Sequence, residues 1–280
     1  MNKKFLISIP TYKESENIEK LIKKIFSLVK NIKILIINDF SDDDTKNIIK
    51  KFGKKVELIE RPKKLGLGTA HILAMLYAIK NNYKFLITMD ADFSHDPKYL
   101  NSLMKYAGKN NFVIGSRFYK NGKSDYTGLR KYISVLGNLV AKKFLNINCN
   151  ELTTYFRVYS VNNLKKLPYD YLNVEGYSLG VRTIWMMNKL GLKIIEIPIH
   201  FKDRNKGKSK IPKLQILTSV LDLFYMRFND SLIKSKFFNN KNYSYSLKIN
   251  CSKCKNNIFS LINKNVYKCL VCGKNRIKKN

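Results

Sequence analysis

Short apolar segments alternate with helical segments through the first 115 residues, and this alternation limits the possible folds more than any other feature. We expect strands at residues 5–9, 33–37, 55–59, 84–89 and 112–115. The intervening segments carry apolar side chains at helical spacing, over residues 15–29, 43–52 and 69–80. Strands that alternate with helices form βαβ units and a mostly parallel sheet. The sequence therefore predicts an α/β fold with a ligand site at the carboxyl ends of the strands.

The second half of the chain is less regular. We expect an amphipathic helix at 129–145, a helix at 177–189, a strand at 193–201, a basic loop at 202–210 and a second amphipathic helix at 211–228. Residues 1–228 are then one domain, 229–250 a linker and 251–280 a separate small module. No apolar run approaches the roughly 18–20 residues of a membrane span. The first apolar run ends at Pro10, so we expect no secretory signal and a cytoplasmic protein.

Two CxxC pairs close the chain: Cys251 with Cys254, and Cys269 with Cys272. This spacing predicts a tetrahedral four-cysteine zinc site, in which each pair forms a turn around the ion. The alternative, two disulfides, requires an oxidising compartment. Cys149 stands alone, and we interpret it as a buried or unreactive thiol.

The net charge of +33, from 53 basic and 20 acidic residues, suggests a polyanionic partner. Most of it comes from 45 lysines spread over the whole chain, whereas side chains that read bases are more often arginine, of which there are eight. We therefore favour attraction to an anionic membrane surface. Residues 231–280 hold twelve basic and no acidic residues, so nucleic-acid or protein binding stays open for this tail.

Three predicted strands end in acidic or polar clusters, at residues 10–14, 38–45 and 90–95. One such cluster would be explained by helix capping, as we expect where a helix starts at Asp96. Three clusters on one edge favour a site instead. Asp90 and Asp92 can turn toward one Mg²⁺ or Mn²⁺ ion, whose other ligands are phosphate oxygens and water. Such an ion would neutralise a departing diphosphate.

Arginines stand at points that suit phosphate binding. Arg117 follows a predicted strand, Arg130 and Ser134 lie one helical turn apart, and Arg204 lies in the basic loop. The planar guanidinium group binds phosphate through two parallel hydrogen bonds. The alternative for Arg117 is a structural ion pair with an aspartate.

These motifs together, in this order, resemble the inverting GT-A glycosyltransferases, and the dolichol-phosphate (polyprenol-phosphate) mannosyltransferase group most. The likeness spans about residues 4–228. Its motifs are Pro10-Thr11-Tyr12-x-Glu14, Asp39-x-Ser41-x-Asp43, Gly66-Leu67-Gly68-Thr69-Ala70, Met89-Asp90-Ala91-Asp92-x-Ser94-His95, Gly115-Ser116-Arg117 and Asp203-Arg204-x-x-Gly207-x-Ser209-Lys210.

The resemblance implies a GT-A fold, to which the zinc ribbon is an addition, and direct transfer of a sugar to polyprenyl phosphate at the cytoplasmic membrane face. It implies roles for the matched positions. The nucleotide sugar would contact Pro10, Tyr12, Glu14, Asp39, Asp42 and Asp90. The cation would bind Asp90 and Asp92, with Ser94 nearby, and the catalytic group would comprise Asp92, Arg117 and Arg204. The acceptor phosphate would contact Arg117, Arg130, Ser134 and Arg204.

Some features depart from the family or leave alternatives. Asn38 stands where an acidic residue is common, and Tyr155 replaces a glycine, which adds bulk near the expected sugar or acceptor pocket. GDP-mannose is the donor implied, with UDP-glucose as an alternative. A hydroxyl acceptor would need a general base, for which Glu175 is the candidate. The helix at 211–228 either meets the membrane or packs on the catalytic domain.

Overall fold

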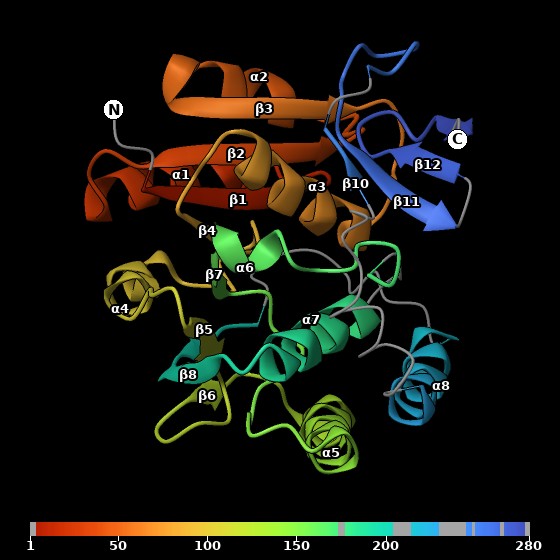
Figure 1. Cartoon of the computed structure of the whole chain (residues 1–280). Coiled ribbons are helices and arrows are strands. Elements are labelled where there is room, and N and C mark those ends of the chain that lie inside the picture. Colours follow the sequence, from red (N-terminus) through yellow and green to blue (C-terminus); the bar gives the residue numbers. More distant parts are fainter. Residues whose placement is uncertain are drawn as a thin grey trace.

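A seven-stranded sheet forms the centre of the molecule in the order β3-β2-β1-β4-β7-β5-β8 (Figure 1). This computed structural model describes residues 4–172, 177–203, 214–229, 245–247, 250–263 and 266–277. The strands are β1 (Phe5–Thr11), β2 (Lys33–Asp39), β3 (Val56–Arg61), β4 (Phe85–Thr88), β5 (Asn111–Ser116), β7 (Arg157–Ser160) and β8 (Lys193–Pro198). β7 pairs antiparallel with β4 and β5, and the other pairs are parallel. The predicted α/β fold with a mostly parallel sheet is confirmed.

Helices cover both faces of the sheet. On one face lie α1 (Ile18–Leu28), α2 (Thr45–Lys50), the 3₁₀ turn η2 (Pro97–Tyr99) and α4 (Leu100–Lys105). On the other lie α3 (Leu67–Lys80), α6 (Val161–Leu164) and α7 (Tyr177–Lys189). α1 buries a single stripe, Ile18, Leu21, Ile22 and Ile25, as its sequence spacing predicts. The helix start expected at Asp96 is also confirmed, because its carboxylate accepts a hydrogen bond from the N–H of Lys98.

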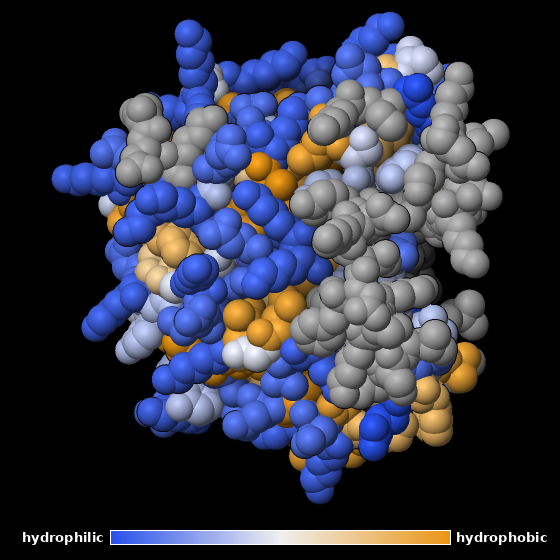
Figure 2. Space-filling view, in the orientation of Figure 1, coloured by the Kyte–Doolittle hydropathy of each residue, from blue (hydrophilic) through white to orange (hydrophobic). Residues whose placement is uncertain are grey.

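Two helices form the outer layer. α5 (Gly128–Leu145) buries only Asn138, Ala141 and Leu145. α8 (Leu214–Phe228) packs on α5 and α7; the rings of Phe144 and Phe224, for example, lie 5.0 Å apart. Apolar side chains gather over α8 at the lower right of Figure 2. Within the described parts of the chain, no helix is long and apolar enough to cross a membrane.

Two smaller sheets complete the fold. The strand expected at 193–201 divides after Pro198, and its second part, β9 (His200–Phe201), pairs with β6 (Lys123–Ser124). The C-terminal sheet contains β10 (Tyr245–Ser246), β11 (Phe259–Asn263), β12 (Val266–Cys269) and β13 (Asn275–Ile277). β10 falls in the segment expected to be a linker, yet it pairs with β11. We call residues 245–247, 250–263 and 266–277 the ribbon.

Candidate active site

The first two polar clusters lie side by side because β1 and β2 are parallel neighbours that end at the same edge. Pro10 lies opposite Ile37 in this ladder. Beyond it, the N–H of Lys13 donates to Ser41 Oγ (2.8 Å), and the N–H of Glu14 donates to Thr45 Oγ1 (3.1 Å). The two loops therefore form one hydrogen-bonded surface at the carboxyl ends of the strands.

Tyr12 and Asp42 lie at the outer part of this surface. The ammonium group of Lys64 lies 4.2 Å from the centroid of the Tyr12 ring, within cation–π range. Lys13 Nζ lies 2.8 Å from an Asp42 oxygen, and this hydrogen bond lowers the pKa of the Asp42 carboxyl. The pair is exposed, so we assign it little stability. A half-buried aromatic ring beside lysines suits the binding of a nucleotide.

Asp39, by contrast, is buried and holds protein groups. It forms an ion pair with Arg61 and accepts hydrogen bonds from the N–H groups of Leu65 (3.3 Å) and Gly66 (3.0 Å). Arg61 also donates to Thr69 Oγ1 (2.7 Å) and to the carbonyl of Gly66 (3.0 Å). Asp39 and Arg61 thus fix the loop at residues 62–66 between β3 and α3. Sequence reasoning missed Arg61, although it is one of eight arginines and ends a strand at the site edge.

The loop after β4 holds Asp90 and Asp92 in a defined arrangement. Ser94 donates to Asp92 through both its N–H (3.1 Å) and its hydroxyl group (2.5 Å). The N–H of Asp90 donates to His95 Nδ1 (2.9 Å), so the ring proton is on Nε2, which donates to Thr154 Oγ1 (2.8 Å). Burial lowers the pKa of His95 and keeps the ring neutral. Two carboxylates on such a loop are ligands that Mg²⁺ and Mn²⁺ accept.

Arg117 pairs with Glu151 rather than with an aspartate. Its Nε and one terminal nitrogen donate to the two Glu151 oxygens, at 2.6 and 2.8 Å. Burial alone would raise the pKa of Glu151, but the attraction of Arg117 and the hydrogen bonds from Arg117 and Thr153 outweigh it and lower that pKa. The antiparallel β7 explains the contact, because its N-terminal end lies at the edge where β5 ends. Arg117 therefore forms a structural ion pair, but its partner is a glutamate and not the aspartate considered from sequence. A phosphate-binding role for Arg117 stays a prediction.

A pocket of about 510 Å³ lies beside this ion pair, and its lining includes Arg117, Lys131 and Ser134. Arg130, predicted to act with Ser134, lies next to the pocket. Its guanidinium carbon is 3.7 Å from the centroid of the Tyr126 ring, and it donates to Asp203 (3.1 Å). Ser134 and Arg117 thus share one pocket. Arg204 and Glu175 lie outside the described residues.

The ring of Tyr155 is buried rather than exposed in this pocket. It stacks on the ring of His71, with the two centroids 4.0 Å apart. Neither nitrogen of His71 has a hydrogen-bond partner among the described residues, and burial lowers its pKa to about 3. The added bulk of Tyr155 therefore contacts α3, where it covers a neutral histidine.

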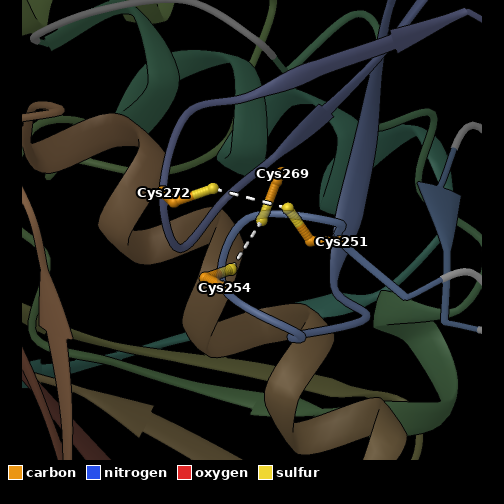
Figure 3. Close-up of side chains that lie close together, drawn as sticks. All are labelled: Cys251, Cys254, Cys269 and Cys272. Atoms are coloured by element: carbon orange, nitrogen blue, oxygen red, sulfur yellow. Dashed lines mark hydrogen bonds between the residues drawn. The ribbon is translucent and has the colours of Figure 1, made fainter.

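The four paired cysteines converge at the ribbon (Figure 3). The Sγ atoms of Cys251 and Cys272 are 3.5 Å apart, those of Cys254 and Cys269 are 3.6 Å apart, and all four lie within 4.8 Å of one another. A tetrahedral zinc ion with Zn–S bonds of about 2.3 Å requires sulfur atoms about 3.8 Å apart. The four thiols fit such an ion. Cys149 is buried elsewhere and donates to the carbonyl of Glu151 (3.1 Å).

Comparisons with known proteins agree with the resemblance to glycosyltransferases that the sequence motifs indicate. The family described as "Glycosyl transferase family 2" matches residues 6–167. The chain is 31% identical over 210 residues to an undecaprenyl-phosphate mannosyltransferase of Micrococcus luteus, covering 74% of this chain and 86% of the relative. It is 27% identical over 212 residues to a polyprenol monophosphomannose synthase of Mycolicibacterium smegmatis, covering 74% of this chain and 80% of the relative.

Solved structures of glucosyl-3-phosphoglycerate synthase from Mycobacterium tuberculosis share the fold. One, in complex with Mn²⁺, UDP-glucose and phosphoglyceric acid, has a TM-score of 0.58 at 18% identity, covering 79% of each chain. Another, in complex with phosphoglyceric acid, has a TM-score of 0.57 at 20% identity, covering 79% of this chain and 80% of that one.

Proposed function

Because the chain belongs to glycosyl transferase family 2, we propose that it transfers mannose from GDP-mannose to a polyprenyl phosphate, with inversion at the anomeric carbon. Both relatives reported above are named for mannose transfer to a polyprenyl phosphate, and the chain spans most of their length. These names support polyprenyl phosphate as the class of acceptor and mannose as the transferred sugar.

The observation that carries this proposal is the pocket beside α5. A phosphate acceptor is already anionic at neutral pH, so it needs positive charge rather than a general base. The lining of the pocket supplies Lys123 and Lys131 beside the paired Arg117, and Ser134 adds a hydroxyl donor. On the same helix, large apolar side chains are exposed, among them Tyr132, Leu136 and Leu139. A charged head group and an apolar chain would each find a matching surface on α5.

On the donor side, the loops after β1 and β2 would hold the nucleotide, with Tyr12 stacked against it or its ribose. Asp90 and Asp92 would hold Mg²⁺ or Mn²⁺, and the bound ion would neutralise the diphosphate as it leaves. Ser94 keeps the Asp92 carboxylate in place. The structural neighbour solved with Mn²⁺ and UDP-glucose supports a role for such a cation. A phosphate oxygen of the acceptor would attack the anomeric carbon from the opposite side, which inverts the configuration.

Incubation of the full chain with polyprenyl phosphate, manganese and either GDP-mannose or UDP-glucose tests this proposal. We expect mannose in the organic phase only when manganese or magnesium is present, and an inverted anomeric configuration by NMR. If no donor labels the lipid and a soluble sugar acceptor is labelled instead, the phosphate acceptor is wrong.

We also propose that the protein binds the cytoplasmic face of an anionic membrane through α5 and α8. Both helices expose large apolar side chains, and Arg130, Lys131, Lys142 and Lys143 add positive charge on α5. Flotation with anionic vesicles should recover the wild type and lose Leu136→Glu. Tyr106→Glu is the matched control, because Tyr106 is also exposed (43% against 60% for Leu136) but lies beyond α4. Equal flotation of the two variants would contradict this surface.

We further propose that the four ribbon cysteines hold one structural zinc ion. Elemental analysis should give one zinc per chain in the wild type and in Cys149→Ser, and much less in Cys269→Ser. Full zinc content in Cys269→Ser would contradict this ligand set.

A further inference from the structure

The ribbon touches the loop that Asp39 and Arg61 hold. Gly273 has φ of +76°, and a Cβ atom added there would lie 3.2 Å from Leu65 Cδ2 and 3.6 Å from Lys63 Cε. A pocket of about 460 Å³ lies between the two parts, lined by Pro62, Lys63, Lys253, Cys272, Gly273 and Lys274. The turn at Cys272 and Gly273 therefore lies against the 62–66 loop.

The ribbon is packed on the catalytic domain rather than attached only through its chain connection. The rings of Tyr169 and Tyr245 lie 5.2 Å apart, and Ser260 Oγ donates to the carbonyl of Tyr169 (3.5 Å). Phe259 and Leu270 are buried in the same hydrophobic cluster as residues of α3 and α7. Figure 1 accordingly places the C-terminal strands next to the end of β3. This packing gives the ribbon a fixed position from which it can hold the loop.

The opposite side of the 62–66 loop belongs to the expected nucleotide site. The N–H groups of Leu65 and Gly66 donate to Asp39, and Lys64 lies over the Tyr12 ring. A shift of the backbone at Leu65 would therefore change both the hydrogen bonds to Asp39 and the position of Lys64. The loop lies between a metal-binding turn on one side and nucleotide-binding side chains on the other.

We propose that the ribbon positions the 62–66 loop for nucleotide binding, so that metal binding at the four cysteines raises the affinity for the nucleoside diphosphate part of the donor. This inference rests on the proposed donor site. Small four-cysteine modules fold only with their metal, so loss of the ion would release the Cys272–Gly273 turn. By linkage, a nucleotide that orders the loop would also raise metal affinity.

A double-mutant cycle on Gly273 and Leu65 in the full chain tests the contact, with GDP and UDP binding measured by calorimetry. Gly273→Ala should weaken nucleotide binding about three- to tenfold, since side chains in direct contact couple to that extent. It should raise the KM for the donor without changing kcat or the KM for the acceptor. In a Leu65→Ala background the obstructing methyl group is gone, so Gly273→Ala should add little. Gly191→Ala is the control. Gly191 has a similar φ of +70°, but a Cβ atom added there would meet no atom within 4 Å beyond its own chain neighbours.

Equal effects of Gly273→Ala in both backgrounds, or unchanged affinity in all variants, would overturn the proposal. Hydrogen exchange gives a second readout: chelation of zinc should speed exchange of the Leu65 and Gly66 amides, while β1 and β2 stay protected. Faster exchange in the ribbon with no change at these two amides would contradict the coupling. Both readouts are independent of the acceptor, so a missing lipid product would contradict the proposed function and leave this inference standing.

Discussion

Replacement of Glu151 by glutamine would test the buried ion pair between Arg117 and Glu151 that lies beside the pocket. Arg117 is 6% exposed and Glu151 is fully buried. Glu151 also accepts hydrogen bonds from the N–H groups of Thr153 and Thr154, both at 3.1 Å. Glu151→Gln keeps the shape of the side chain at position 151 but leaves the guanidinium charge of Arg117 buried without a counter-charge. Loss of one partner of a buried pair costs about 3–5 kcal/mol. In a domain of this size each kcal/mol lowers Tm by about 2–4 °C.

Urea and thermal unfolding at several pH values would measure the effect. The folded-state pKa of Glu151 lies below its ordinary value of 4.5, so its stabilisation is present above that value and is lost as the pH falls through the folded pKa. The gap in unfolding free energy between wild type and Glu151→Gln should therefore be constant from neutral pH to about 4.5 and shrink in stronger acid. If the unfolding free energies of wild type and Glu151→Gln differ by less than about 1 kcal/mol at pH 7, the pair behaves like an exposed ion pair and the reasoning from burial is wrong.

The double variant Glu151→Leu with Arg117→Met separates structure from catalysis. Apolar replacement of both partners of a buried pair often restores stability. If Arg117 also binds substrate phosphate, as predicted, the double variant should regain stability but lose transfer activity about ten- to hundredfold, the loss expected for a hydrogen bond to a charged group. Recovery of both stability and activity would show that Arg117 serves only the fold.

Three further predictions concern other buried or acidic groups. Asp90→Asn and Asp92→Asn should abolish most transfer while the unfolding midpoint stays within a few degrees; retained activity would contradict the cation site. His71→Phe should keep the stacking on Tyr155 and stabilise the protein in mild acid. Because the pKa of His71 is lowered from 6.5 to about 3 by burial, only the unfolded chain binds its proton between these values, which costs wild-type stability about 2 kcal/mol at pH 5. Equal slopes of stability against pH for the two proteins would contradict this. Arg61→Met should leave Asp39 buried without its ion pair and weaken nucleotide binding, which calorimetry and urea unfolding would detect together.

The sheet could be predicted from the sequence except for one strand. The other six strands were expected, five within residues 5–115 and one at 193–201, and each is present. Most of them are apolar runs bounded by polar residues. β7 begins with Arg157 and has only four residues, so neither alternation nor an apolar run marks it. Arg157 can be buried there because it donates to the carbonyls of Thr154, Leu152 and Gly180. These partners come together only after folding.

The sequence indicates which residues form the site, but not which of them pair with one another. Asp39, Asp90 and Asp92 could be recognised because each follows a predicted strand. Their neighbours are set by the strand order, which joins Arg117 to Glu151 across 34 residues of sequence. The outward face of α5 is a second such case: the helix was expected to be amphipathic, but only the structure shows that its apolar residues are largely exposed.

The exposed face of α5 predicts that the lipid chain of the acceptor matters as much as its phosphate. Transfer of a CH₂ group from lipid to water costs about 0.8 kcal/mol, so withdrawing one five-carbon isoprene unit costs roughly 3–4 kcal/mol. An acceptor that stays in the bilayer avoids this cost only if the pocket lies at the membrane surface, as Ser134 and Leu136 on one helix would allow. Leu136→Glu should therefore raise the KM for a long-chain polyprenyl phosphate in vesicles, but not for a short, water-soluble analogue. An equal rise for both acceptors would mean that Leu136 acts on the pocket itself and that α5 does not deliver the substrate from the membrane.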